Sequence, residues 1–293
     1  MDEQIVQQTP TIGIIGGSGL YHMSGLANVR QLDIETPFGK PSAPIITGAL
    51  AGRQLAFLAR HGIGHHISPT EVPFPANIYA LKSVGVERII SISACGSLRE
   101  DYAPGQIVIP DQLFDFTHNR QRTFFEDGLV AHISVADPFC PDLSNHILEA
   151  VHSAGGQAHF GGSFITIEGP RFSTKAESNT FRAWGMSIIG MTTSPEAYLA
   201  REAEMCYGVM AHVTDYDVWH TSEKPVTVEM VIEILNRNTH LAQEVITHLV
   251  QALPAERNCS CPNALASALI TQQDRIPNET RQRLSLLVSK YLK

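Results

Sequence analysis

The sequence predicts an α/β fold, with a single domain built on a twisted, mixed central β-sheet that is flanked by helices. Apolar segments of strand length alternate along the chain with segments of helical apolar spacing, an order typical of α/β domains. Several strands are apolar on both faces, as expected for central strands covered on both sides. Composition does not change along the chain and no internal repeat is present, so one domain over residues 1–293 is expected.

Apolar runs that end in glycine or small polar residues indicate the strands in the first half of the chain. These runs are 11–20, 54–62, 88–98 and 105–116. Residues 74–86 have helical apolar spacing and stop at Gly85, so they predict a helix.

The second half continues the alternation and ends in helices. The expected elements are a strand and loop over 161–174, a helix over 176–185, a strand, turn and helix over 187–203, and a strand over 207–217. Apolar residues recur at helical spacing from 226 to 253 and predict a long amphipathic helix. A final helix is expected over 279–292.

The composition excludes several functional classes. The net charge of -8, without a basic stripe, argues against nucleic-acid binding. No apolar run is long enough for a membrane helix, and the first ten residues are polar and acidic, unlike a secretory signal. We therefore expect a cytoplasmic protein that binds neither nucleic acid nor membranes.

Polar residues gather where the predicted strands end. In open α/β sheets, ligands bind beyond the carboxyl ends of the strands, so these residues are expected to surround one pocket. They are Ser18, Arg60, His61, Ser93, Ala94, Met191, Thr192, Asp215 and Asp217.

One group of these residues predicts an anion site. The Gly-Gly-Ser-Gly turn at Ser18 offers backbone N–H groups and a hydroxyl, although by itself it is better explained as a tight turn. It matches neither the dinucleotide-binding nor the Walker fingerprint. Arg60 at a strand end can bind phosphate in a bidentate manner, or form a salt bridge with a carboxylate. With His61 and the hydroxyls of Ser93 and Thr192, the phosphate interpretation is favoured.

Two clusters raise the question of a metal. His61, His65 and His66 lie in the segment HGIGHH, but the segment contains no acidic residue and is broken by glycines. We expect His61 to be functional, and His65 and His66 to be loop or interface residues. Cys259 and Cys261 form a Cys-Ser-Cys pair, which is a redox pair, half of a metal site or two unrelated thiols. Further ligands are not evident near this pair, so no metal is expected.

Asp215 and Asp217 follow a buried strand in the segment TDYD. Residues two apart in an extended chain point to the same side, and two close carboxylates do not both ionise readily. One then donates a hydrogen bond while the other accepts, which suits the N7 and 6-amino edge of adenine. The alternative is a solvated turn or a helix N-cap.

Several segments, taken in order, resemble the 5′-methylthioadenosine phosphorylases, a family of the trimeric purine nucleoside phosphorylase superfamily. They include GIIGGSGL, LARHG, SACGSLRE, TIEGPRFST, MTTSPEAYLAREA and TDYDVW, and the similarity spans about residues 11 to 250. The resemblance implies a purine nucleoside phosphorylase-like fold and phosphorolysis of 5′-methylthioadenosine to adenine and 5-methylthioribose 1-phosphate. Phosphate is then a co-substrate, and no cofactor is expected.

The resemblance also implies roles for individual residues. Asp215 would be the acid at N7, Asp217 the partner of the 6-amino group, and Met191 would lie under the ribose. Phe172 and Ser173 would lie beside the base. The phosphate site would consist of Ser18, Arg60, His61, Ser93, the backbone of Ala94, and Thr192.

The methylthio pocket would be formed by Val228, Val231 and His132, with His132 supplied by the neighbouring subunit of a homotrimer or of a dimer of trimers.

The segment 253–293 resembles the family least, and residues 1–10 are expected to be a tail. The Cys-Ser-Cys pair of segment 253–293 is similar to that of archaeal and thermophilic relatives, in which cysteines matching Cys140 and Cys206 form a disulfide. Because charged residues are only 17% and cytosolic disulfides are rare, we expect reduced thiols here.

Three alternatives remain open at this point. A phosphorylase of broader or 6-oxopurine specificity, acting on inosine or methylthioinosine, would usually carry Asn in place of Asp215. A nucleoside-binding protein with an inactive site would not release the base. A metal-dependent hydrolase would need no phosphate and would be inhibited by a chelator.

Overall fold

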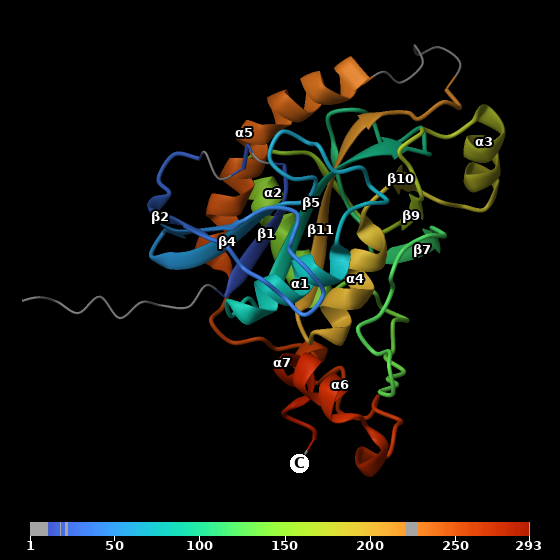
Figure 1. Ribbon diagram of the computed structural model, residues 1–293. Coiled ribbons are helices and arrows are strands. Elements are labelled where there is room, and N and C mark those ends of the chain that lie inside the picture. Colours follow the sequence, from blue (N-terminus) through green and yellow to red (C-terminus); the bar gives the residue numbers. More distant parts are fainter. Residues whose placement is uncertain (1–10, 18, 21–22, 221–227, 293) are drawn as a thin grey trace, which may run out of the picture.

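A mixed β-sheet of eleven strands forms the centre of the protein in the computed structural model, which describes residues 11–17, 19–20, 23–220 and 228–292 (Figure 1). Side chains of residues 228–238 are outside this description. The strands are β1 (Ile12–Gly16), β2 (Ala27–Leu32), β3 (Ile45–Leu50), β4 (Arg53–Ala59), β5 (Arg88–Ser97), β6 (Ile107–Ile109), β7 (Gln112–Phe116), β8 (Ala158–Phe160), β9 (Ser163–Ile167), β10 (Ile188–Gly190) and β11 (Cys206–Asp215).

The sheet branches at β5. Its main path runs β2-β3-β4-β1-β5-β10-β9-β7, while β11, β6 and β8 continue from the other edge of β5. Along the first edge, β5 pairs with β1 in parallel at 88–91 and with β10 in antiparallel orientation at 96–97. Between these two ladders, residues 92–95 of β5 have a strand partner on the β11 side only. The sheet is therefore open at this point.

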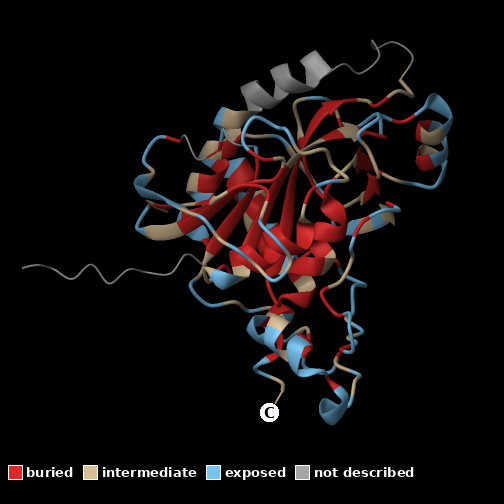
Figure 2. Ribbon diagram, in the orientation of Figure 1, coloured by how far each residue is buried: buried red, intermediate tan, exposed pale blue. Residues whose placement is uncertain are grey.

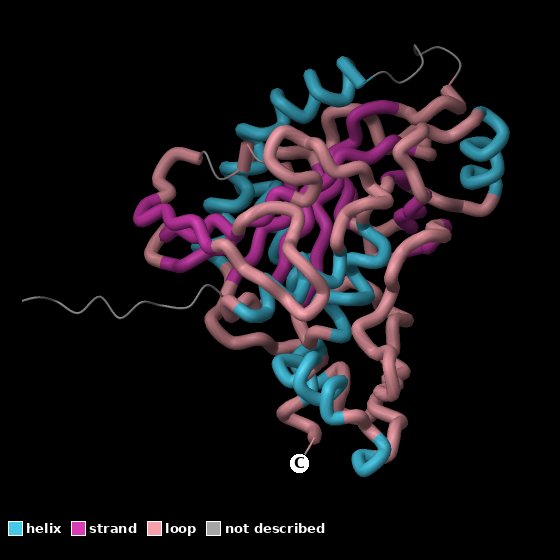
Figure 3. The backbone as a smooth tube through the Cα atoms, viewed as in Figure 1, coloured by secondary structure: helices cyan, strands magenta, loops and turns pink. Residues whose placement is uncertain are grey.

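Helices cover both faces of the sheet (Figures 1 and 3). Helices α1 (Phe74–Ser83) and α4 (Thr193–Glu202) pack on one face, and α2 (Pro141–Ser153) and α5 (Val228–Ala252) pack on the other. Most of β1, β5 and β11 is buried between these layers, as Figure 2 shows. None of the helices within the described ranges combines the length and apolarity needed to cross a bilayer.

Smaller elements complete the chain. Helix α3 (Lys175–Ala183) begins with a capping box between Thr174 and Glu177. The C-terminal segment carries the short helices η1 (Cys261–Asn263), η2 (Gln273–Arg275), α6 (Asn278–Arg283) and α7 (Ser285–Val288), and it projects from the sheet in Figure 1.

The predicted α/β class is confirmed, and the structure corrects the predictions in two places. The strand expected over 105–116 is two strands, since Pro110 lacks a backbone N–H for the ladder and the chain changes partner there. The helix expected over 279–292 is broken into α6 and α7 at Leu284. Elements β2, β3, α2 and β8 lie in segments to which the sequence analysis assigned no structure.

Candidate active site

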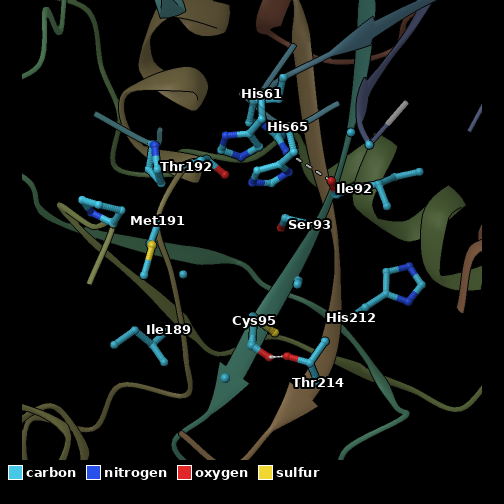
Figure 4. Close-up of a pocket in the computed structure, with 18 of the residues that line it drawn as sticks. His61, His65, Ile92, Ser93, Cys95, Ile189, Met191, Thr192, His212 and Thr214 are labelled. Carbon is cyan, nitrogen blue, oxygen red and sulfur yellow. Dashed lines mark hydrogen bonds between the residues drawn. The ribbon is translucent and has the colours of Figure 1, made fainter. Parts of the chain in front are cut away.

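A cavity of about 660 Å³ opens at the gap in the sheet, where β1, β4, β5 and β11 end (Figure 4). This volume is within the range usual for small-molecule sites. The cavity brings together most of the residues predicted from the sequence: Arg60, His61, Ser93, Ala94, Phe172, Ser173, Met191, Thr192, Asp215 and Asp217. Ser18 is outside the described residues, although its neighbours Gly17 and Gly19 line the cavity.

The gap in strand pairing along the first edge of β5 exposes the residues that form the polar end of the cavity. Residues Ile92, Ser93, Ala94 and Cys95 all line the cavity, and they are the residues of β5 without a strand partner on the first edge. The hydroxyl of Ser93 is buried and has no hydrogen-bond partner among the described residues. In Figure 4, Ser93 lies between the His61–His65 pair and the end of the cavity that contains Cys95 and Thr214.

Arg60 is engaged mainly inside the protein. Its Nε and Nη2 donate to Glu196 at 2.8 Å each, Nη2 also donates to Ser91 Oγ at 2.7 Å, and Nη1 donates to the carbonyl of Ile92 at 3.2 Å. Glu196 also accepts from the Tyr207 hydroxyl at 2.7 Å. Of the five N–H groups of arginine, these bonds leave one on Nη1. The salt bridge that the sequence analysis named as the alternative is therefore present, and the bidentate phosphate contact is not available.

His61 is held as a neutral ring. Its Nδ1 lies 2.9 Å from the carbonyl of Ile67, and burial together with the positive charge of Arg60 lowers its pKa to about 4. A carbonyl accepts only from a protonated nitrogen, so Nδ1 carries the proton and Nε2 is an acceptor.

The ring of His65 stacks on that of His61 with 4.3 Å between centroids, and His65 lines the cavity. His65 lies in an exposed turn, as expected for a loop residue, and it also contributes to the lining of the cavity. His66 does not line the cavity; its ring lies over Gly62.

The two aspartates lie at the other end of the cavity, and both are buried. Asp215 accepts from the Thr214 hydroxyl at 2.6 Å and from the backbone N–H of Asp217 at 2.7 Å. Burial raises the pKa of Asp215, and burial with the charge of Asp215 raises the pKa of Asp217 to about 6. Oδ2 of Asp217 has no hydrogen-bond partner among the described residues. Both carboxyl groups therefore hold a proton more readily than exposed aspartates do.

A β-bulge turns Asp215 into the cavity. The register between β11 and β5 shifts between Val213 and Asp215, so that no residue of β5 lies opposite Thr214, and Asp215 lies opposite Gly96. A Cβ on Gly96 would lie 3.0 Å from Oδ1 of Asp215, which explains why glycine is needed there.

Of the three residues predicted for the methylthio pocket, only His132 has a described side chain, and it does not line this cavity. His132 is exposed, and its backbone N–H donates to the carbonyl of Ala268 at 2.8 Å, away from the cavity of its own chain. Val228 and Val231 belong to α5, but their side chains are outside the described residues.

Sequence reasoning missed several lining residues, including Cys95, Ile189, His212 and Thr214. His212 is buried in β11, burial lowers its pKa to about 4, and neither ring nitrogen has a partner among the described residues. The only indication in the sequence is that His212 interrupts a mainly apolar strand, which suggests a specific role for its side chain.

The cavity lies at the strand ends of a mixed sheet and has hydroxyl and imidazole groups at one end and paired carboxyl groups at the other. This arrangement is typical of an enzyme that acts on nucleosides. The chain belongs to the phosphorylase superfamily, whose family model matches residues 11–251.

Close relatives and solved structures extend this match over nearly the whole chain. The S-methyl-5′-thioadenosine phosphorylase of Geobacter sulfurreducens is 53% identical over 96% of this chain and 99% of its own length, and that of Chloroflexus aurantiacus is 52% identical over 96% and 98%. A methylthioadenosine phosphorylase from an antarctic soil metagenomic library has a TM-score of 0.92 at 47% identity, covering 96% of this chain and 100% of that one. The Schistosoma mansoni enzyme in complex with adenine has a TM-score of 0.81 at 34% identity, covering 96% and 98%.

Proposed function

We propose that this chain is a pentosyltransferase that catalyses the phosphorolysis of S-methyl-5′-thioadenosine. Inorganic phosphate attacks C1′, the glycosidic bond breaks, and adenine and 5-methylthioribose 1-phosphate leave. The observation that carries this proposal is that the Asp215–Asp217 pair shares one cavity with His61, Ser93 and Thr192. Relatives that are about half identical to this chain carry the name of the same activity.

Phosphate binds at the polar end of the cavity in this proposal. The unpartnered hydroxyl of Ser93, the hydroxyl of Thr192 and the backbone of Ala94 supply donors, and Ser18 adds a further hydroxyl. Arg60 contributes its remaining N–H, while Glu196 holds the guanidinium in place and neutralises part of its charge.

His61 then has a specific task. Because Nε2 of the neutral ring accepts, it takes the hydrogen bond of the one hydroxyl that hydrogen phosphate carries near neutral pH. This contact orients the phosphate so that an unprotonated oxygen faces C1′. A nucleophile fixed in this way lowers the barrier by positioning, and its negative charge stabilises the cation-like ribosyl centre.

Adenine binds at the carboxyl end. The protonated carboxyl of Asp215 donates to N7 as the glycosidic bond breaks, and Asp217 accepts from the 6-amino group. A positioned acid contributes about 10²–10⁴-fold to such a step. Phe172 and Ser173 flank the base, and Met191 lies under the ribose.

The 5′ end of the nucleoside requires a second subunit in this proposal. His132 is exposed and remote from the cavity of its own chain, so it would complete the methylthio pocket of a neighbour in a homotrimer, together with Val228 and Val231. The reaction needs no cofactor, since phosphate is a co-substrate, and it would return adenine and the methylthioribose unit to salvage in the cytoplasm.

A base-release assay separates this proposal from its rivals. Methylthioadenosine, adenosine, methylthioinosine and inosine are each incubated with the protein, with and without phosphate, and the free base is quantified. We expect the fastest release from methylthioadenosine, and only with phosphate. Faster release from the 6-oxopurines would favour the broader phosphorylase. Release that needs no phosphate and stops with a chelator would favour a hydrolase. No release by a folded protein would favour a binding protein.

A further inference from the structure

Four of the five cysteines meet at one point of the structure, remote from the cavity. The Sγ atoms of Cys140, Cys206, Cys259 and Cys261 all lie within 4.8 Å of one another, and those of Cys206 and Cys259 are 3.3 Å apart. The sequence alone predicts no metal here, because further ligands are not evident near the Cys-Ser-Cys pair. That premise is wrong, because α2 and β11 bring in two further thiols from distant parts of the chain.

Each thiol is carried by a fixed backbone. Cys140 is the N-cap of α2, and its N–H donates to the carbonyl of Tyr207 at 2.9 Å, which places it beside Cys206 at the start of β11. The chain that carries Cys259 and Cys261 is fixed in turn, since Arg88 Nη2 donates to the carbonyl of Glu256 at 2.7 Å and Cys261 begins η1.

The spacing of the sulfurs suits a single tetrahedral ion. Zinc–sulfur bonds of about 2.3 Å place the four sulfurs of a tetrahedron about 3.8 Å apart, which falls between the 3.3 Å contact and the 4.8 Å limit of this cluster. Two disulfides would instead divide the sulfurs into two bonded pairs, whereas these four thiols are free. A ligand set of sulfur alone selects zinc or iron over harder cations.

The surroundings offset the charge of such a centre. Four thiolates around Zn²⁺ carry a net charge of about -2. Nη1 of Arg201 lies 3.3 Å from Sγ of Cys261. Cys140 is at the N-terminus of α2, which is the positive end of the helix dipole. Nη2 of Arg201 donates to the carbonyl of Asp137 at 2.6 Å, which fixes the guanidinium beside the sulfurs.

We propose that Cys140, Cys206, Cys259 and Cys261 form a structural Zn²⁺ site with four thiolate ligands. Three of the thiols are buried, and Cys259 is partly exposed and provides the entry path. The bound ion leaves no position for substrate, so its role is to attach the C-terminal segment to the sheet. Binding is not a redox step: Zn²⁺ displaces one proton from each protonated thiol.

The test measures metal in the full-length protein, purified anaerobically with a phosphine reductant and without chelator. Elemental analysis is expected to find about one zinc per chain, and Co²⁺ substitution is expected to give the intense visible bands of a tetrahedral thiolate site. Cys259→Ser removes the ligand with the least packing. Loss of an outer partner of a metal ligand usually costs 10–100-fold in affinity, so this variant should bind zinc more than about 100-fold more weakly. Cys95→Ser makes the same change at the one cysteine outside the cluster and should keep one zinc.

The outcomes distinguish the alternatives whatever the catalytic activity is. Wild-type protein and Cys95→Ser that both bind zinc, with Cys259→Ser binding far more weakly, support the site. Iron in place of zinc would overturn the choice of metal. Failure of the reduced, folded wild-type protein to take up Zn²⁺ or Co²⁺ would overturn the proposal. So would mass spectra that show two disulfides among these four cysteines in protein taken from a reducing cytosol. If Cys259→Ser does not fold, competition of a chromogenic chelator with the wild-type protein still measures the affinity.

Discussion

Replacing Asp215 by Asn tests the proposed chemistry at the base while leaving the fold nearly unchanged. The amide oxygen of Asn can still accept from the backbone N–H of Asp217, a bond of 2.7 Å in the present structure. The amide N–H₂ then faces the hydroxyl of Thr214, which can turn its proton to the carbonyl of Cys95 at 3.2 Å and accept instead. One hydrogen bond is kept and one is reversed, so the free energy of unfolding should fall by no more than about 1.5 kcal/mol.

The expected effect on catalysis is much larger. An amide cannot transfer a proton to N7, so Asp215→Asn should slow adenine release by about 10²–10⁴-fold, or about 3–5 kcal/mol of activation free energy. The same amide can donate to O6 of a 6-oxopurine. The ratio of kcat/KM for methylthioinosine to that for methylthioadenosine should therefore rise by at least about 100-fold.

The assay compares kcat/KM for the two nucleosides at saturating phosphate. Tyr216→Phe is the matched control, because Tyr216 lies between the two aspartates in sequence, is not among the residues that line the cavity, and has its hydroxyl 3.4 Å from the carbonyl of Glu100. It should leave the ratio unchanged. A ratio that moves less than about threefold in Asp215→Asn would refute the assignment of the aspartates to the purine edge.

Three further predictions concern the surroundings of the site. Arg60→Met should lower the free energy of unfolding by about 3–5 kcal/mol, because it leaves the Glu196 carboxylate buried without a cationic partner, and it should also raise the KM for phosphate. The double variant Arg60→Met/Glu196→Gln should recover part of the free energy of unfolding in urea titrations, but its KM for phosphate should stay raised in kinetic assays. An unchanged KM for phosphate in both variants would remove Arg60 from the site. Gly96→Ala places a methyl group 3.0 Å from Oδ1 of Asp215 and should lower kcat by roughly tenfold, since small displacements of catalytic groups are costly; wild-type kcat would show that this approach does not matter. Burial raises the pKa of Glu202 from 4.5 to about 7, so its stabilising contribution is complete below pH 4.5 and is lost as the pH rises to about 7. Over this window the free energy of unfolding should fall by about 3 kcal/mol in the wild type relative to Glu202→Gln, and parallel pH profiles of the two proteins would contradict this.

The central layer of the fold could be predicted because its signals are local. The buried strands β1, β5 and β11 are largely apolar, and polar residues follow or end them, so their positions and the pocket at their ends could be expected. Strand β2 is almost entirely exposed and lacks such a run. Nothing in its own sequence favours a strand over a loop; pairing with β3 decides it.

Most of the site could be anticipated, but the partners of its residues could not. Glu196 is separated from Arg60 by more than a hundred residues, and only the packing of α4 against the sheet shows that it takes up most of the guanidinium. The cysteine cluster was missed for the same reason, since its four thiols come from three separate segments. The role of Gly96 depends on a bulge in another strand, which no local pattern indicates.

The gap in the ladder along β5 has a consequence for solvent exchange. Residues 88–91 are paired on both edges, whereas the amides of residues 92–95 that point to the first edge meet the cavity instead of another strand. Hydrogen exchange should therefore be fast at these few amides in the middle of an otherwise protected strand. Phosphate bound there would slow their exchange without altering their neighbours, so a single strand would report occupancy of the cavity before any turnover is measured.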